Sequence, residues 1–341
     1  MKRWTFVAFV APSLAMMIVF IAIPLVIVIV QSFQDRRQVF RAETTEQCTP
    51  GFPNPVCTSS ATMVPVLDGA GEPVRETVFT GWGNYTALLQ PGAVAAAFSP
   101  GGGGLAAVLN IDFYKALRFT LTFTLGTLPF VIGVGLALAV ALNATHRLVR
   151  GPVTFISLLP LIITPVIGAL SIRWLFVGDG ILTHLIEHIT GQKIAIFAHG
   201  WAIELLMMFY RVWSTAPFAF IIFYAGLQSL NQDALDSAIV DGASRWHRLR
   251  YVVIPHLMPL ITFVSLIHLM DSYRVFDEVV GFSSQARVIS LQWLTYDLLT
   301  PNQSGVRAIG RASASSMLTM LGIVLLLTPL VVRIWRDHRR G

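Results

Sequence analysis

The chain has 341 residues, of which 55% are hydrophobic and only 12% are charged. A soluble domain is nearer a quarter charged, so this composition excludes an ordinary water-soluble fold and indicates a protein dissolved in a lipid bilayer. The net charge is +6. In a membrane protein such an excess reflects loop lysines and arginines that set topology. The sequence has no basic cluster interleaved with aromatic residues, so nothing in it favours nucleic acid as a partner.

The first apolar run, Phe6–Val30, follows Lys2 and Arg3. A signal peptide has an apolar core of only about 7–15 residues, so this longer run predicts an uncleaved transmembrane helix in residues 1–30. The chain then changes character. Residues 31–110 carry charges, prolines, a glycine run and the only cysteines, Cys48 and Cys57. We expect this segment to be a long loop outside the membrane.

Residues 111–341 contain five further apolar spans, each long enough to cross the hydrocarbon core as a helix. The predicted spans are Phe113–Asn143, Val153–Val177, Trp201–Leu227, His256–Phe282 and Ala308–Ile334. Backbone groups in lipid must be paired within the segment, which favours helices over strands. The sequence therefore predicts an all-α, polytopic membrane protein with about six transmembrane helices.

The distribution of basic residues in the short loops predicts the orientation. With the N-terminus inside, the loops and ends on the inner side hold Lys2, Arg3, Arg147, Arg150, Arg245, Arg248, Arg250, Arg333, Arg336, Arg339 and Arg340. The short outer loops hold only Lys193, Arg287 and Arg307. Both termini are therefore expected in the cytoplasm and residues 31–110 outside it. On that oxidising side, Cys48 and Cys57 are expected to form a disulfide; two free thiols are the alternative.

Residues 231–255 form a polar and basic stretch between two apolar spans, on the predicted cytoplasmic side. The apolar positions Leu235, Ala238 and Ile239 are typical of a short amphipathic helix with one buried stripe. Gly242 then interrupts the pattern, as a helix-ending glycine does. By physical chemistry alone, such a helix either lies on the lipid surface or fits a groove on a partner protein.

The residues of this stretch resemble the EAA signature of binding-protein-dependent ABC importer permeases. The usual pattern is Glu-Ala-Ala, two residues, Asp-Gly-Ala, and a closing Leu-Pro; here the corresponding residues are Asp236-Ser237-Ala238, Asp241-Gly242-Ala243 and Ile254-Pro255. The departures are at Asp236, Ser237 and Ile254. Further matches are Ala11-Pro12-Ser13, Trp82-Gly83-Asn84-Tyr85, Leu159-Pro160, Trp174-Leu175-Phe176, Gly180-Ile181-Leu182 and Phe276-Asp277. Their order resembles the carbohydrate-uptake branch, in particular the larger maltose-type permease subunit.

This resemblance implies a type I ABC importer-like fold, with residues 111–341 as the permease core. It implies one permease subunit of a sugar importer in the bacterial inner membrane, acting with a second permease, two ATPase subunits and an extracytoplasmic solute-binding protein. The coupling helix would contact the ATPase through Asp236, Ala238, Asp241, Gly242 and Ala243. The chain has no phosphate-binding loop of the G-x-x-x-x-G-K-[ST] type, so ATP and Mg²⁺ are expected in the partner ATPases, with no cofactor or metal and no enzymatic activity here.

Polar residues inside the predicted spans are the candidates for substrate contact, because charges cost roughly 2.5–3.5 kcal/mol at a helix centre and usually face a polar interior. On one helix face, His268, Asp271, Ser272 and Val275 have i, i+3, i+4, i+7 spacing. In the maltose-type subunit the same helices contribute to the sugar site. The candidate set is Arg211, Trp213, Ser214, Thr215, Phe218, His268, Asp271 and Ser272. The structural alternative is that Arg211, Asp271 and Arg274 form ion pairs between helices.

Three other functions stay open. A polyol or glycerol-phosphodiester cargo would keep the architecture, and Arg211 and Arg274 would suit a phosphate. A self-sufficient secondary transporter would often show inverted repeats and broken helices in both halves, which the sequence does not reveal. A membrane enzyme is favoured only by His184, Glu187 and His188, which match an H-x-x-E-H zinc pattern on a short outer loop.

Overall fold

The computed structural model describes residues 3–49, 56–69, 71, 73–178, 180–191, 196–302 and 305–340. The chain divides into two compact units. Unit 1 comprises Met1–Pro91 and Thr295–Leu318, and unit 2 comprises Gly92–Leu294 and Thr319–Gly341. Helices dominate both units, and every strand of the described chain lies between residues 34 and 79.

Five helices are long and apolar enough to cross a membrane: Phe9–Ser32, Asp112–Asn143, Gly200–Gln228, Arg245–Tyr273 and Ile309–Arg336. A bent pair, Leu148–Ile162 and Pro165–Phe176, makes a sixth if it is one span. These helices confirm the predicted helical, polytopic class with about six spans.

In unit 1, the first span is one continuous helix made of α1 (Arg3–Met17), a π-helical turn (Ile18–Ala22) and α2 (Ile23–Ser32). The widened turn lies just before Pro24, which lacks an amide hydrogen and whose ring clashes with the carbonyl four residues earlier in a regular α-helix. Side chains from Phe9 to Ser32 are almost all exposed. This apolar surface is the kind that lipid or another membrane subunit covers.

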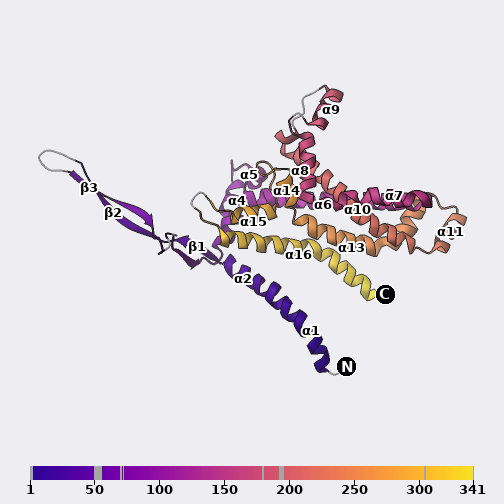
Figure 1. Ribbon diagram of the computed structural model, residues 1–341, viewed down its shortest axis with the longest axis horizontal. Coiled ribbons are helices and arrows are strands. Elements are labelled where there is room, and N and C mark those ends of the chain that lie inside the picture. The colour runs from indigo at the N-terminus through magenta and orange to yellow at the C-terminus, as the bar shows by residue number, and fades with distance from the viewer. Residues whose placement is uncertain are drawn as a thin grey trace. The chain divides into compact units, whose positions relative to one another are not determined.

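The segment 31–110 was expected only as a loop, but it forms two antiparallel strand pairs. Strand β1 (Gln34–Gln38) pairs with β4 (Arg75–Phe79), and β2 (Phe40–Thr49) pairs with β3 (Val56–Pro65) in a second sheet (Figure 1). The β2–β3 register sets Cys48 opposite Cys57. The two cysteine side chains lie outside the described part of the structure, so their disulfide stays a prediction.

The end of the first span is tied to helix α3 (Gly83–Leu89) by the Trp82-Gly83-Asn84-Tyr85 motif. The Asn84 amide Nδ2 donates to the carbonyls of Ser32 and Gln34, both at 2.9 Å. Tyr85 donates to Ser32 Oγ at 2.8 Å, and the Trp82 ring packs against Phe33. In α16 (Ile309–Arg340), Gly310 fits against Asn84, where a Cβ atom would lie 2.6 Å from Nδ2. The motif therefore joins the end of the first span to the first turn of α16.

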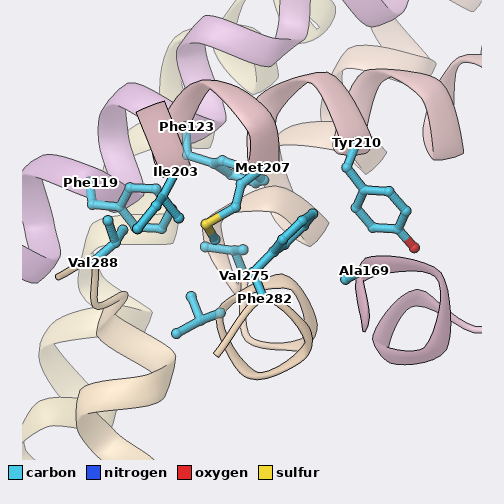
Figure 2. Packing of buried hydrophobic residues seen from close by; sticks show 10 residues of the cluster. Phe119, Phe123, Ala169, Ile203, Met207, Tyr210, Val275, Phe282 and Val288 are labelled. Carbon is cyan, nitrogen blue, oxygen red and sulfur yellow. The ribbon is translucent and has the colours of Figure 1, made fainter. Parts of the chain in front are cut away.

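Unit 2 begins with α4 (Pro91–Ala97, whose Pro91 belongs to unit 1) and α5 (Gly104–Leu109), followed by its principal helices. These are α6 (Asp112–Asn143), α10 (Gly200–Gln228) and α13 (Ile254–Tyr273). One apolar cluster joins Phe119 and Phe123 of α6 to Met207 and Tyr210 of α10, and to Phe282 (Figure 2). A second cluster continues the same helix contacts through Phe220, Phe223 and Leu257. The first cluster packs α10 against α6 and the segment after α13, and the second packs it against α6 and α13, which positions the site described below.

The third predicted span, Val153–Val177, is wrong as a single helix. Helix α7 (Arg147–Ile162) and helix α8 (Pro165–Phe176) are bent by 94°. Ile163 and Thr164 between them are extended, with ψ of 129° at each. The residue before a proline is disfavoured in the helical region, so Pro165 explains the break.

The fifth predicted span, His256–Phe282, also needs correction. Its helix starts earlier, with α12 (Arg245–Arg248), a π-helical turn (Leu249–Val253) and α13 in sequence, and it ends at Tyr273. Two short helices follow, α14 (Asp277–Gly281) and α15 (Leu291–Leu299). Val275 therefore lies beyond the helix and does not share a helical face with His268, Asp271 and Ser272.

Close contact between α6 and α10 depends on Gly135, where a Cβ atom would lie 2.6 Å from the Ala219 Cβ atom. Small residues at such positions let membrane helices approach. Gly135→Ala is expected to lower stability by about 1–3 kcal/mol, the usual cost of overpacking, measured by thermal unfolding in detergent. Gly133→Ala on the same helix meets no atom within 4 Å and is the matched control, expected to be neutral or slightly stabilising. An equal loss in both variants would contradict the packing argument.

Candidate functional site

A pocket of about 220 Å³ lies in unit 2 where α10 and α13 face the break between α7 and α8. Six of the predicted substrate-binding residues line it: Arg211, Ser214, Thr215, Phe218, His268 and Asp271. Pro160, Leu161, Ile163 and Pro165 at the helix break complete the wall with Val264 and Ile267. Side chains 60 residues apart in the chain thus share one cavity, with hydroxyls, a carboxylate, an imidazole and an aromatic ring.

Two predicted residues do not line this pocket. Trp213 lies on α10, is 40% exposed, and packs its ring 6.1 Å from that of Tyr210. Ser272 is fully buried and accepts a hydrogen bond from Arg211 Nε at 3.2 Å. Ser272 therefore orients the guanidinium group and is not in a position to contact a ligand directly.

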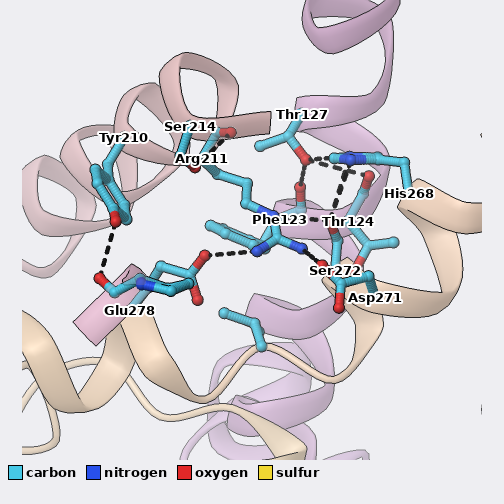
Figure 3. Close-up of polar contacts among 12 residues, drawn as sticks. Phe123, Thr124, Thr127, Tyr210, Arg211, Ser214, His268, Asp271, Ser272 and Glu278 are labelled. Atoms are coloured by element: carbon cyan, nitrogen blue, oxygen red, sulfur yellow. Dashed lines mark hydrogen bonds and ion pairs between the residues drawn. The ribbon is translucent and has the colours of Figure 1, made fainter. Parts of the chain in front are cut away.

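Arg211 is buried at the centre of a polar network (Figure 3). Its Nη1 donates to Glu278 Oε1 at 2.9 Å, and its Nη2 is paired with Asp271 Oδ2. The Asp271 side chain is 67% exposed whereas that of Glu278 is 2% exposed. One cation thus connects α10, α13 and α14, and only the Asp271 carboxylate reaches open space.

The network continues from Arg211 to α6 (Figure 3). Thr127 Oγ1 donates to the Phe123 carbonyl at 2.7 Å and lies 2.9 Å from His268 Nε2. Because the single hydroxyl hydrogen of Thr127 is used on the carbonyl, His268 Nε2 must carry the hydrogen of that contact. His268 is therefore held as a donor to α6, with Ser272 Oγ 3.4 Å from its Nδ1. These contacts fix the orientations of the Thr127, His268 and Ser272 side chains.

Sequence reasoning missed Glu278 and Thr127. Glu278 could have been identified, because it lay inside a predicted span, where an unpaired charge is as costly as it is for Arg211 or Asp271. Arg211 and Asp271 do form an ion pair, between α10 and α13. Arg274 is exposed, and it does not line the pocket.

Glu278→Gln is expected to destabilise the protein by about 3 kcal/mol, because Glu278 is the buried partner of Arg211 and the remaining partner, Asp271, is 67% exposed and compensates the buried charge only in part. Urea or thermal unfolding in detergent would measure the loss. Glu204→Gln removes the same charge from the pair with Arg118, whose arginine side chain is 39% exposed. The Glu204 side chain is 13% exposed, so this control is expected to cost less than Glu278→Gln, about 1 kcal/mol, because water reaches the Arg118 side of the pair. Equal losses would show that Glu278 is not the stabilising partner of Arg211.

The predicted docking stretch forms helix α11 (Gln232–Val240), with Asn231 as its N-cap: the Asn231 side chain accepts from the Asp233 amide at 2.9 Å. At the other end, Gly242 adopts a φ of 76°. The Gly242 amide donates to the Ile239 carbonyl at 3.0 Å, and the Ala243 amide donates to the Ala238 carbonyl at 2.9 Å. This pair of bonds is a Schellman motif, which needs a left-handed residue and explains the glycine.

The surface of this stretch is exposed and partly apolar. Val240 is 86% exposed and Trp246 is 64% exposed, while Asp236 and Asp241 are exposed beside them. The predicted buried stripe holds for Leu235 and Ala238, which are half-buried, but Ile239 is 52% exposed. An exposed apolar surface with acidic neighbours is suited to a protein groove.

The zinc-like pattern lies on helix α9 (Ile181–Thr190), where His184 Nδ1 is 4.0 Å from Glu187 Oε2. Among the residues that the structure describes, no group of three or more His, Cys, Asp or Glu side chains is arranged to hold a metal ion.

Comparisons with known proteins agree on one class. A family model described as "Binding-protein-dependent transport system inner membrane component" matches residues 103–338. The chain is 28% identical over 270 residues to the trehalose transport system permease protein SugA of Mycobacterium tuberculosis, covering 76% of each chain. It is 26% identical to the trehalose/maltose transport system permease protein MalF of Thermococcus litoralis, over 67% of this chain and 76% of that one.

A solved structure is similar in fold. The crystal structure of a bacterial ABC transporter involved in the import of the acidic polysaccharide alginate aligns with a TM-score of 0.58 and 22% identity. The alignment covers 72% of this chain and 88% of that chain.

Proposed function

This chain belongs to the family of binding-protein-dependent transport system inner membrane components, and on that premise we propose that it is a permease subunit of an ATP-driven sugar importer. It is a multi-pass protein of the inner membrane and a transport component. Relatives carry names that specify trehalose, maltose and lactose as their cargo. The observation that carries the proposal is the pocket formed by α10, α13 and the break between α7 and α8.

The chemistry of this pocket favours an uncharged sugar. Ser214, Thr215 and Asp271 offer hydrogen-bonding groups for hydroxyls, and the Phe218 ring offers an apolar face for ring C–H groups. Arg211 is already neutralised by Asp271 and Glu278, and Arg274 lies outside the lining. A phosphodiester cargo would need net positive charge here, so this alternative is disfavoured.

The helix break at Ile163 and Thr164 supports a transport site at this position. Irregular backbone at membrane depth is tolerated where it is buried in protein or lines a cavity, and transporters often bind substrate at discontinuous helices. Here Tyr210 of α10 donates to the Pro165 carbonyl at 2.8 Å, which ties the start of α8 to the helix that lines the pocket. With a volume below the ~300–1,000 Å³ common for ligand sites, the pocket is proposed to be completed by a second permease subunit.

Energy coupling is proposed to pass through α11 and the Gly242 turn. In this scheme two ATPase subunits hold ATP and Mg²⁺, and their closure moves the α11 surface made by Asp236, Ala238, Asp241, Gly242 and Ala243. The permease pair then changes between inward-facing and outward-facing states, which must be close in free energy. An extracytoplasmic solute-binding protein delivers the cargo. Both chain termini and α11 lie in the cytoplasm in this arrangement.

Reconstitution in proteoliposomes tests the proposal directly. The chain is combined with the proposed second permease, ATPase subunits and solute-binding protein. Uptake of radiolabelled trehalose, maltose or lactose into the vesicles is expected only when ATP is inside the vesicles and the binding protein is outside them. Uptake by the chain alone would identify a secondary transporter, and uptake of a glycerol phosphodiester in place of sugars would overturn the cargo.

A further inference from the structure

Unit 1 contains a second and larger cavity, a cleft of about 830 Å³. It lies between the β1–β4 strand pair and α3 on one side and the chain leading from α15 into α16 on the other. Its volume is within the ~300–1,000 Å³ range common for ligand sites. The cleft is remote in sequence from the sugar pocket and shares none of its lining residues.

Four arginines line this cleft: Arg36, Arg37, Arg307 and Arg311. The acidic residues of the lining are only Asp35 and Asp297, so the lining carries a net positive formal charge. Asp35 is engaged by Arg37, whose Nε lies 3.6 Å from Asp35 Oδ2. The guanidinium groups come from two segments about 270 residues apart, which only the fold brings together.

Helix α16 adds to this positive potential. Its first turn holds Arg311 and no acidic residue. The N-terminal end of a helix carries the positive end of the helix dipole, where an anion is favoured and a cation is not. Both the side chains and the helix end therefore favour a bound anion.

The position of the cleft relative to the spans indicates which class of anion is available to bind there. Arg36 and Arg37 follow the candidate span Phe9–Ser32 almost directly, and Arg307 precedes the span Ile309–Arg336. Phe79 lines the cleft and is 75% exposed, and Trp82 nearby is 68% exposed. Exposed aromatic residues beside basic residues at the ends of spans are typical of the depth at which lipid headgroups lie.

We propose that this cleft binds the phosphate of an anionic phospholipid headgroup, held by Arg36, Arg37, Arg307 and Arg311. Arginine suits this role because its planar donors match phosphate oxygens in pairs. The bound lipid would hold the end of the first span against the start of the last one. This inference does not depend on the identity of the transported cargo.

Thermal unfolding of the full-length chain in neutral detergent provides the test. Phosphatidylglycerol, phosphatidylcholine and inorganic phosphate are titrated separately, since a ligand that binds only the folded state raises the unfolding midpoint. Phosphatidylglycerol is expected to raise the midpoint, and phosphatidylcholine is not. A rise with inorganic phosphate at similar concentration would identify the free anion as a ligand of the same cleft.

In the double variant Arg307→Gln/Arg311→Gln, the phosphatidylglycerol concentration needed for a half-maximal rise of the unfolding midpoint is expected to increase at least tenfold. Its matched control is Arg41→Gln/Arg287→Gln, which removes the same charge from two exposed arginines outside the cleft and should retain the effect. Native mass spectrometry of both variants would count retained lipid independently of stability. The assignment is overturned if no probe raises the wild-type midpoint, or if both double variants respond like the wild type.

Discussion

Asp271→Ala is expected to lower the rate of sugar uptake at least 100-fold while leaving the amount of folded protein unchanged. The Asp271 side chain is 67% exposed and lines the pocket, so its carboxylate, although paired with Arg211 through Oδ2, keeps acceptor sites for sugar hydroxyls. The fold is expected to survive because Arg211 keeps its buried partner Glu278 and its bond to Ser272. Uptake of labelled sugar in proteoliposomes and the unfolding midpoint in detergent would be measured on the same preparation.

Arg274→Ala is the matched control for this variant. It removes an exposed charge three residues away that does not line the pocket, and normal uptake is expected. If Asp271→Ala transports normally, the carboxylate has no role in substrate binding. If it instead fails to fold, Asp271 belongs with Glu278 as a structural partner of Arg211.

Gly242→Val is expected to uncouple the permease from the ATPase. Sugar would then no longer stimulate ATP hydrolysis, and uptake would be lost as well. No atom lies within 4 Å of a Cβ added at this position, so the effect does not come from a clash. It comes from the backbone: a φ of 76° is strained for a β-branched residue, and the Schellman bonds that end α11 depend on it. The α11 surface would then be presented in a different direction. ATPase activity of the complex, with and without loaded binding protein, measures this.

Gly191→Val is the control that separates coupling from general backbone strain. Gly191 ends α9 with a φ of 68° and also has no atom within 4 Å of an added Cβ. On the proposed topology it lies on the opposite side of the membrane from the ATPase, so coupling should persist. Substrate-stimulated ATPase activity that survives in Gly242→Val would count against α11 as the coupling element. Binding of ligand to the pocket is expected to be unchanged in both variants.

Composition and local pattern were enough to predict the membrane class and most of the spans. Long apolar runs must become helices in lipid, because each backbone group needs a partner within its own segment. The Asp-Gly-Ala core of the docking stretch was equally readable, since a glycine that ends a helix is a local requirement that Gly242 meets. Most of the substrate-binding candidates predicted on α10 and α13 line one pocket, because polar side chains within spans turn away from lipid.

Tertiary structure alone decided the remaining features, and each depends on contacts between segments distant in sequence. Strand β1 pairs with β4 some 40 residues later, which no periodicity in residues 31–110 reveals. Glu278 became the buried partner of Arg211 only because α14 turns back after α13 ends at Tyr273. The same holds for the arginine cleft, whose members come from opposite ends of the chain. Hydropathy depends on one residue at a time, whereas the pairing of charges and strands depends on which surfaces the fold brings together.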